Sequence, residues 1–171
     1  PRTGTITYTQ VYDGTDYRAS DHDETAWTLT KGMRLGITSD TRFENITFNL
    51  TGSSGYLLLI ANFHEVTIGR GCEMHGNFAW NALAQSFTVL GGCQDNDNLA
   101  AEGMNPRINV ESGDVYLVLY NRGTAKNFKK NADVASSTAT VNIGGGRVHN
   151  LYAGSVSSGL KGGSSEINIS G

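Results

Sequence analysis

The sequence predicts an all-β protein folded as a right-handed parallel β-helix, or β-solenoid, with coils of about 20–22 residues. Three observations support this fold class. An apolar–polar–apolar motif recurs at near-constant spacing, small polar residues and glycine replace much of the usual charge, and no segment shows convincing helical periodicity. The 22 glycines against 2 prolines suit a chain with many tight corners, because glycine adopts positive φ without a steric cost.

The recurring motif is a polar residue between two apolar ones. Its copies are Ile46-Thr47-Phe48, Val66-Thr67-Ile68, Phe87-Thr88-Val89, Ile108-Asn109-Val110, Val141-Asn142-Ile143 and Ile167-Asn168-Ile169. Their first members are 20, 21, 21, 33 and 26 residues apart, which predicts regular rungs with Val66, Phe87 and Ile108 stacked in succession. The middle residues should point outward and form a ladder of hydroxyls followed by a ladder of amides.

A glycine stands three residues after the last member of four of these motifs and marks a predicted corner. These glycines are Gly71, Gly92, Gly113 and Gly146. We expect them to share one backbone conformation with positive φ, since a sharp corner favours it.

The two cysteines, Cys72 and Cys93, directly follow two of the corner glycines and are 21 residues apart. At the same phase of consecutive coils their Cα atoms would be about 4.8 Å apart, a distance that a disulfide can bridge. A pair of small, buried thiols is the alternative. The spacing therefore predicts adjacency and leaves the covalent bond open.

An antiparallel β-sandwich is the main rival fold, because it also contains many short strands. Its strands need not keep a fixed phase, and it usually contains several tight hairpin turns, of which only Asp13-Gly14 is a candidate here. We divide the chain into an N-terminal cap or irregular first coil, residues 1–40, and β-helix coils over residues 41–171. Polar loops are expected as insertions near 94–106 and 121–139.

Composition excludes several classes of protein. A net charge of −3 argues against a nucleic-acid partner, which would usually require a basic surface. No apolar run is long enough for a transmembrane segment. The chain opens with Pro1 rather than methionine, and its last motif stops part-way into another coil, so we expect it to be part of a longer chain.

Several segments resemble the coils of surface-exposed, adhesin-like right-handed parallel β-helix proteins of gut Firmicutes. The segments are Thr41–Phe48, Leu59–Asn62, Val66–Gly69 and Val141–Gly154, and the likeness covers roughly residues 27–171. Such proteins look like adhesins or scaffolds in long multidomain chains, which implies a bacterial, secreted or cell-surface protein. The same fold carries polysaccharide-cleaving enzymes, so the resemblance does not decide the activity.

Candidate chemistry is sparse. Asp95 and Asp97 alternate with asparagines in one polar loop and could supply oxygen ligands to calcium, but a solvated loop with Asx-turns is the favoured explanation. No other cofactor is indicated. The acids on the regular coils are Glu65, Glu73, Glu111 and Asp114, and none has a partner in phase on a neighbouring rung. A catalytic constellation is therefore not evident, and enzyme activity stays uncertain but is not favoured.

The function expected from these patterns is a non-enzymatic extracellular or cell-surface module, an adhesin or rigid spacer. Its exposed loops would bind a glycan or a host surface protein. The alternative is a carbohydrate-active β-helix, a polysaccharide lyase or glycosidase, with its site beside one of the inserted loops. Paired carboxylates beside exposed aromatic residues in a groove would favour the alternative.

Overall fold

The computed structural model describes residues 4–16, 27–29, 32–51, 56–76, 86–92, 105–111, 116–120, 138–152 and 164–170, and within these ranges every regular element is a β-strand. The strands are β1 (Ile6–Thr9), β2 (Val11–Tyr12), β3 (Thr15–Asp16), β4 (Trp27–Leu29), β5 (Met33–Gly36), β6 (Thr41–Glu44), β7 (Thr47–Leu50), β8 (Leu57–Ile60), β9 (Glu65–Ile68), β10 (Glu73–Gly76), β11 (Phe87–Leu90), β12 (Arg107–Val110), β13 (Tyr116–Tyr120), β14 (Thr138–Ile143), β15 (Arg147–Tyr152) and β16 (Ser164–Ile169).

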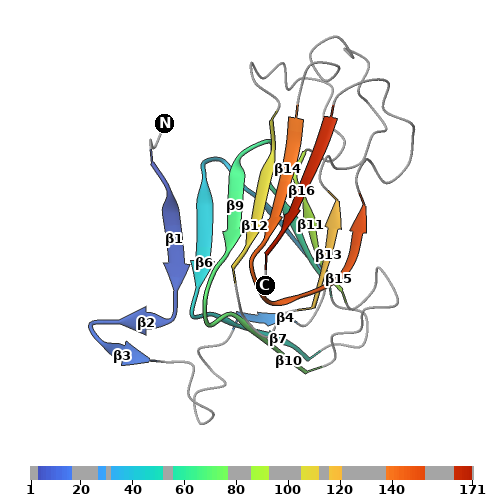
Figure 1. Ribbon diagram of the computed structural model, residues 1–171. Coiled ribbons are helices and arrows are strands. Elements are labelled where there is room, and N and C mark those ends of the chain that lie inside the picture. The colour runs from blue at the N-terminus through green and yellow to red at the C-terminus, as the bar shows by residue number, and fades with distance from the viewer. Residues whose placement is uncertain are drawn as a thin grey trace.

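Three sheets contain all of these strands except a short hairpin. The six-stranded sheet has the order β1-β6-β9-β12-β14-β16, the five-stranded sheet the order β15-β13-β11-β8-β5, and the three-stranded sheet the order β10-β7-β4 (Figure 1). Every strand pair in these sheets is parallel. The antiparallel pair β2–β3 projects from the C-terminal end of β1 and turns at Asp13 and Gly14, both with positive φ (Figure 1). The prediction of an all-β protein with parallel sheets is confirmed.

The chain visits the three sheets in a fixed order. It runs through the three-stranded, five-stranded and six-stranded sheets as β4, β5 and β6, then as β7, β8 and β9, and then as β10, β11 and β12. From β12 onward, the described strands alternate between the six-stranded and five-stranded sheets. Each strand therefore aligns with a strand one turn of the chain away.

The registers correct the predicted repeat. Val66 aligns with Ile108, and Ile108 with Val141, on the six-stranded sheet. Phe87 instead lies on the five-stranded sheet, where it aligns with Leu57. The predicted stacking of Val66, Phe87 and Ile108 on consecutive rungs is therefore wrong. The motif predicts a strand with two inward side chains on any of the three sheets, because side chains alternate between the core and the outside on each of them.

The coil length differs from the prediction for the same reason. Trp27 and Phe48, which are 21 positions apart, do align. Val66 and Ile108, however, align across 42 positions. The steps of 20 and 21 residues between successive motifs lead from a strand of one sheet to a strand of another sheet, not to the next strand of the same sheet. A uniform coil of 20–22 residues is not what the registers show.

The core lies where the inward side chains of the three sheets meet. Phe43, Phe48 and Phe87 come from three different sheets and are each at most 1% exposed. The ring centroids of Phe43 and Phe48 are 6.1 Å apart, and those of Phe48 and Phe87 are 4.9 Å apart with an edge-to-face arrangement. Such aromatic contacts add to the free energy of burial. They tie the three sheets to one core.

Two of the predicted corner glycines, Gly71 and Gly92, lie at different corners of the coil. Gly71 has φ 68° and lies between the six-stranded and three-stranded sheets, where the Asn45 amide donates to the Arg70 carbonyl. Gly92 lies between the five-stranded and six-stranded sheets, because its carbonyl accepts from the amide of Asn62, at 3.1 Å. The premise that Gly71 and Gly92 occupy the same phase of consecutive coils is therefore wrong, and the predicted adjacency of Cys72 and Cys93 stays a prediction.

Cys72 is buried, and its Sγ donates to the carbonyl of Phe43 at 3.4 Å. Gly146 has φ 75°. Gly113 and Cys93 lie outside the described residues, as do 94–104 and 121–137 of the expected insertions.

In the expected cap, β1, β4 and β5 already align with later strands. The described part of the chain contains no helix that could cross a membrane.

Candidate functional site

The outer surface of the six-stranded sheet carries a network of polar contacts among the described residues. Its central row follows the registers from β1 to β16 and alternates with the inward apolar positions. The row consists of Thr7, Arg42, Thr67, Asn109, Asn142 and Asn168. We call this surface the polar face and include in it the flanking residues Glu44, Glu65, Arg107 and Glu111.

Three asparagines of the central row form a hydrogen-bonded ladder. The Nδ2 atom of Asn168 donates to Oδ1 of Asn142 at 2.9 Å, and Nδ2 of Asn142 donates to Oδ1 of Asn109 at 2.8 Å. Asn109 in turn donates to Oγ1 of Thr67 at 3.1 Å. All of these bonds run in one direction along the stack, so each amide satisfies its neighbour.

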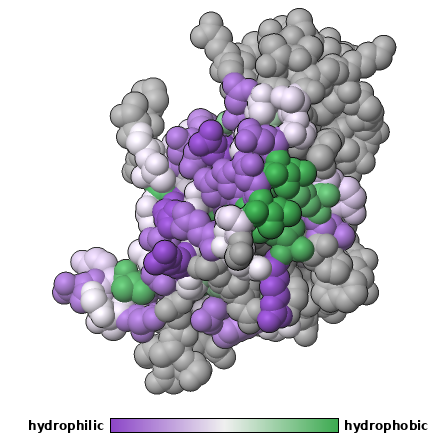
Figure 2. Space-filling model, in the orientation of Figure 1, coloured by the Kyte–Doolittle hydropathy of each residue, from purple (hydrophilic) through white to green (hydrophobic). Residues whose placement is uncertain are grey.

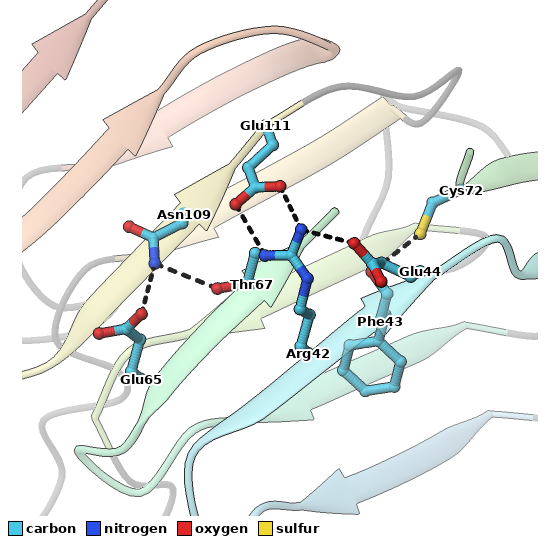
Figure 3. A network of polar contacts seen from close by, with 8 residues as sticks. All are labelled: Arg42, Phe43, Glu44, Glu65, Thr67, Cys72, Asn109 and Glu111. Atoms are coloured by element: carbon cyan, nitrogen blue, oxygen red, sulfur yellow. Dashed lines mark hydrogen bonds and ion pairs between the residues drawn. The ribbon is translucent and has the colours of Figure 1, made fainter. Parts of the chain in front are cut away.

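Arg42 binds two glutamates on either side of β9: Glu44 on β6, and Glu111 directly after the end of β12 (Figure 3). Its Nη1 atom donates to Oε1 of Glu111 at 2.7 Å, and Nη2 bonds to Oε2 of the same carboxylate. Nη2 also donates to Oε1 of Glu44 at 2.6 Å. The guanidinium therefore makes a bidentate contact with Glu111 and bridges it to Glu44, an arrangement stronger than a single ion pair.

Gly69 provides the space for this contact. It follows Ile68, which aligns with both Phe43 and Val110, so Gly69 lies between Glu44 and Glu111 in the sheet. A Cβ at this position would lie 2.9 Å from Cγ of Glu44 and 3.0 Å from Nη2 of Arg42. Only glycine therefore lets the arginine side chain cross β9 at this point.

The pairing fixes the charges of this cluster. Hydrogen bonds from Arg42 lower the pKa of Glu111, and bonds to Glu111 and Glu44 raise the pKa of Arg42. A general acid of a glycosidase needs a carboxyl with a raised pKa. The pKa of Glu111 is shifted in the opposite direction, so Glu111 does not have the raised pKa of such an acid.

A second cluster lies beside the ladder. Glu65 accepts a hydrogen bond from Nδ2 of Asn109 at 2.9 Å, and its other carboxylate oxygen is 3.9 Å from Nη1 of Arg107. The backbone amide of Glu65 donates to Oδ1 of Asp40 at 2.9 Å, and Nδ1 of His64 is 3.7 Å from the same oxygen. The outward charges of β9 and β12 thus bind one another.

The amide ladder confirms part of the sequence prediction. Asn109, Asn142 and Asn168 stack as expected, with Thr67 next in the row. Thr47 and Thr88 do not join them, because β7 and β11 belong to the other two sheets. Both of these threonines are buried, whereas the sequence predicted that their side chains point outward.

The arginine cluster was missed, although no acid lies in phase with Glu111 on a neighbouring strand, where Gly69 and Gly144 stand. Glu44 and Glu111 are on rungs two strands apart, and they come together only because Arg42 spans the strand between them. A useful signal was present: Gly69 interrupts a run of outward polar positions. Its meaning depends on a register that spacing alone did not reveal.

The proposed calcium ligands, Asp95 and Asp97, lie outside the described residues. Among the described residues, no group of three or more histidines, cysteines or carboxylates is arranged to hold a metal ion. Comparison of the chain with protein-family models, with curated proteins and with solved structures gave no match.

Proposed function

We propose that the chain is a right-handed parallel β-helix that acts as a non-enzymatic extracellular or cell-surface module, either an adhesin or a rigid spacer. The ordered passage through three parallel sheets around one core supports the helical path. Right-handed crossovers between parallel strands of one sheet are almost universal, which supports the hand.

The observation that carries the functional proposal is the bonding on the polar face. Arg42 and Glu111 are joined across an intervening strand, and Asn109, Asn142 and Asn168 are joined from strand to strand. These side-chain bonds run along the stack, in addition to the backbone bonds between strands. A polar surface whose groups bind one another suits a stiff support better than a reaction centre.

Ligand binding in such a module falls to the connections between strands. Loops that extend from a regular scaffold vary without disturbing it and often carry the binding residues. We assign this role to the polar insertions 94–106 and 121–139, with a glycan or a host surface protein as ligand. A secreted or cell-surface location follows from the same proposal.

The test is binding of the purified chain to arrays of glycans and host surface glycoproteins, with degradation of the same polysaccharides assayed in parallel. We expect binding without degradation. Replacement of residues 122–136 by a short Gly-Ser linker should abolish binding or change its ligand specificity, whereas Arg42→Gln should leave binding unchanged. Release of new sugar ends would instead support the carbohydrate-active alternative. A chain that neither binds nor degrades would retain only the spacer role.

A further inference from the structure

The chain passes from the five-stranded sheet to the six-stranded sheet at the same corner in each turn (Figure 1). The first two of these connections, residues 37–40 and 61–64, are only four residues long, so the corner itself requires little chain. The next two connections carry the insertions 94–106 and 121–139, to which we assigned ligand binding and which we call the first and the second insertion. Both insertions therefore extend from one corner of the coil.

The two insertions begin and end at neighbouring positions. Leu90 aligns with Tyr120, so the insertions leave the five-stranded sheet from adjacent strands, β11 and β13. Arg107 aligns with Thr140, so they return to adjacent strands of the six-stranded sheet, β12 and β14. Aligned residues of neighbouring strands are about 4.8 Å apart. The bases of the two insertions are therefore side by side, within the length of one extended ligand.

The preceding corner fixes the start of the first insertion. The amides of Asn62 and Phe63 donate to the carbonyls of Gly92 and Gly91, at 3.1 and 3.0 Å. The φ values of Asn62 and Phe63 are 49° and 68°, a conformation that is rare for a side chain as bulky as that of Phe63. Such a conformation persists where the surrounding structure holds it. Gly91 and Gly92 therefore leave the five-stranded sheet at a defined position.

A side chain fixes the end of the second insertion. The amide of Thr140 donates to the backbone carbonyl of Pro106 at 2.9 Å, as in a regular parallel ladder, in which every second amide of a strand bonds to the same neighbour. Two positions earlier, the amide of Thr138 donates instead to the side-chain Oδ1 of Asn105, at 2.7 Å. Asn105 belongs to the first insertion and Thr138 to the second. This bond therefore joins the end of one insertion to the end of the other.

The described residues at the base of the insertions are polar and accessible. Asp40, His64, Glu65 and Arg107 lie where β6, β9 and β12 begin, and their side chains are between 39% and 55% exposed. Figure 2 shows hydrophilic residues over the six-stranded sheet around these strands. Carboxylates accept hydrogen bonds from sugar hydroxyls and arginine donates to them, whereas a protein partner would favour an apolar centre. The surroundings of the insertions therefore favour an oligosaccharide.

We propose that Asn105 is a positioning residue that joins the two insertions into one binding site for an oligosaccharide. Its side-chain oxygen holds the end of the second insertion against the end of the first, so that both insertions contact the same sugar chain. This role rests on the proposed function, in which the insertions bind the ligand. Without the bond, only a fraction of the molecules has the insertions in the binding arrangement, and the apparent affinity falls by that fraction.

Substitutions of Asn105 test this role by isothermal titration calorimetry, with circular dichroism to verify folding. The probe is the free oligosaccharide that gives the strongest signal for the parent chain on the glycan array. Asn105→Ala should weaken its binding about tenfold, because one hydrogen bond that holds the binding arrangement is lost. Asn105→Asp keeps an acceptor for Thr138 and should bind with nearly the affinity of the parent. Asn142→Ala is the matched control, since it also removes a bonded asparagine, but from the ladder, and its affinity should equal that of the parent.

The stoichiometry of binding tests whether the insertions form one site. One shared site predicts one oligosaccharide per chain, and binding should be lost when a Gly-Ser linker replaces either residues 94–104 or residues 122–136. Two separate sites predict two oligosaccharides per chain, with one still bound after either replacement. That result would overturn the proposal.

The outcomes separate this role from the proposed function. An affinity of Asn105→Ala equal to that of the parent, or equal losses in Asn105→Ala and either Asn105→Asp or Asn142→Ala, would refute the positioning role and leave the insertions as the binding segments. A parent that binds no oligosaccharide would refute the assigned ligand and this role together. Binding to a host glycoprotein that survives enzymatic removal of its glycans would show a protein ligand and would also refute the proposal.

Discussion

Arg42 and Glu111 are 69 positions apart in the chain, yet the guanidinium of one bonds both carboxylate oxygens of the other. The contact joins β6 to the end of β12 across β9, and it depends on the missing side chain of Gly69. Two consequences of this relationship can be measured, one through the glycine and one through the carboxylate.

Gly69→Ala should destabilise the protein by about 1–3 kcal/mol, the usual cost of forcing atoms into a filled space. Its Cβ would lie 2.9 Å from the Phe43 carbonyl oxygen as well as from Glu44. Gly144→Ala is the matched control, because Gly144 lies in the same row but its nearest such neighbour would be 3.8 Å away. Urea denaturation of both variants measures the difference. Equal stabilities would contradict the role assigned to Gly69.

Glu111→Gln should make the free energy of unfolding depend less strongly on pH in the acid range. The pKa of Glu111 is lowered in the folded protein, so its contribution is present above the unfolded value, near 4.5, and is lost as the pH falls through the folded pKa. At neutral pH the loss should be below about 1 kcal/mol, because the Glu111 side chain is 39% exposed and screened by solvent. Urea midpoints of parent and variant between pH 7 and pH 2 should converge toward the acid end. Parallel profiles would count against the pair.

Asn142→Asp should disturb the middle of the amide ladder. A carboxylate cannot donate to Oδ1 of Asn109, so an acceptor would face an acceptor and the variant should lose about 1–2 kcal/mol at pH 7. The deficit should shrink at acid pH, where the protonated carboxyl can donate again. Asn105→Asp serves as the control, since Asn105 uses Oδ1 as an acceptor, toward Thr138, and a carboxylate keeps that role. Chemical denaturation at two pH values separates the cases.

Phe48→Ala should be the most damaging of these substitutions, at about 3–5 kcal/mol. Phe48 is fully buried and contacts aromatic rings from both other sheets. Tyr12→Ala, at a side chain 76% exposed, should change stability by less than about 0.5 kcal/mol. Thermal unfolding followed by circular dichroism gives both values. A small effect at Phe48 would mean that the three sheets do not share one core.

The sequence predicted what short-range alternation determines and missed what depends on register. Val66-Thr67-Ile68 and Phe87-Thr88-Val89 each predict a strand with two inward side chains, and both are strands. The same pattern cannot tell which sheet a strand joins, so the two motifs were placed on one stack although they belong to different sheets.

The errors at the site have the same origin. Gly71 and Gly92 were given one phase by a spacing that spans two different corners. The ladder from Asn109 to Asn168 was found because those three strands do share a sheet. Arg42 and Glu111 were not connected, since a long side chain that passes over a glycine leaves no periodic trace in the sequence.

In the three parallel sheets each strand aligns with the strand one turn away, and this has a consequence for how the protein folds. Most backbone pairing links segments 21 to 42 positions apart, so a turn can form on its neighbour without waiting for distant parts of the chain. Folding should then spread from turn to turn and, under mild denaturant, should recede from the ends. Amide hydrogen exchange should be fastest in β16 and slowest in β9, with intermediate rates at β12 and β14. Stability in this molecule would be a gradient along the stack rather than a single value.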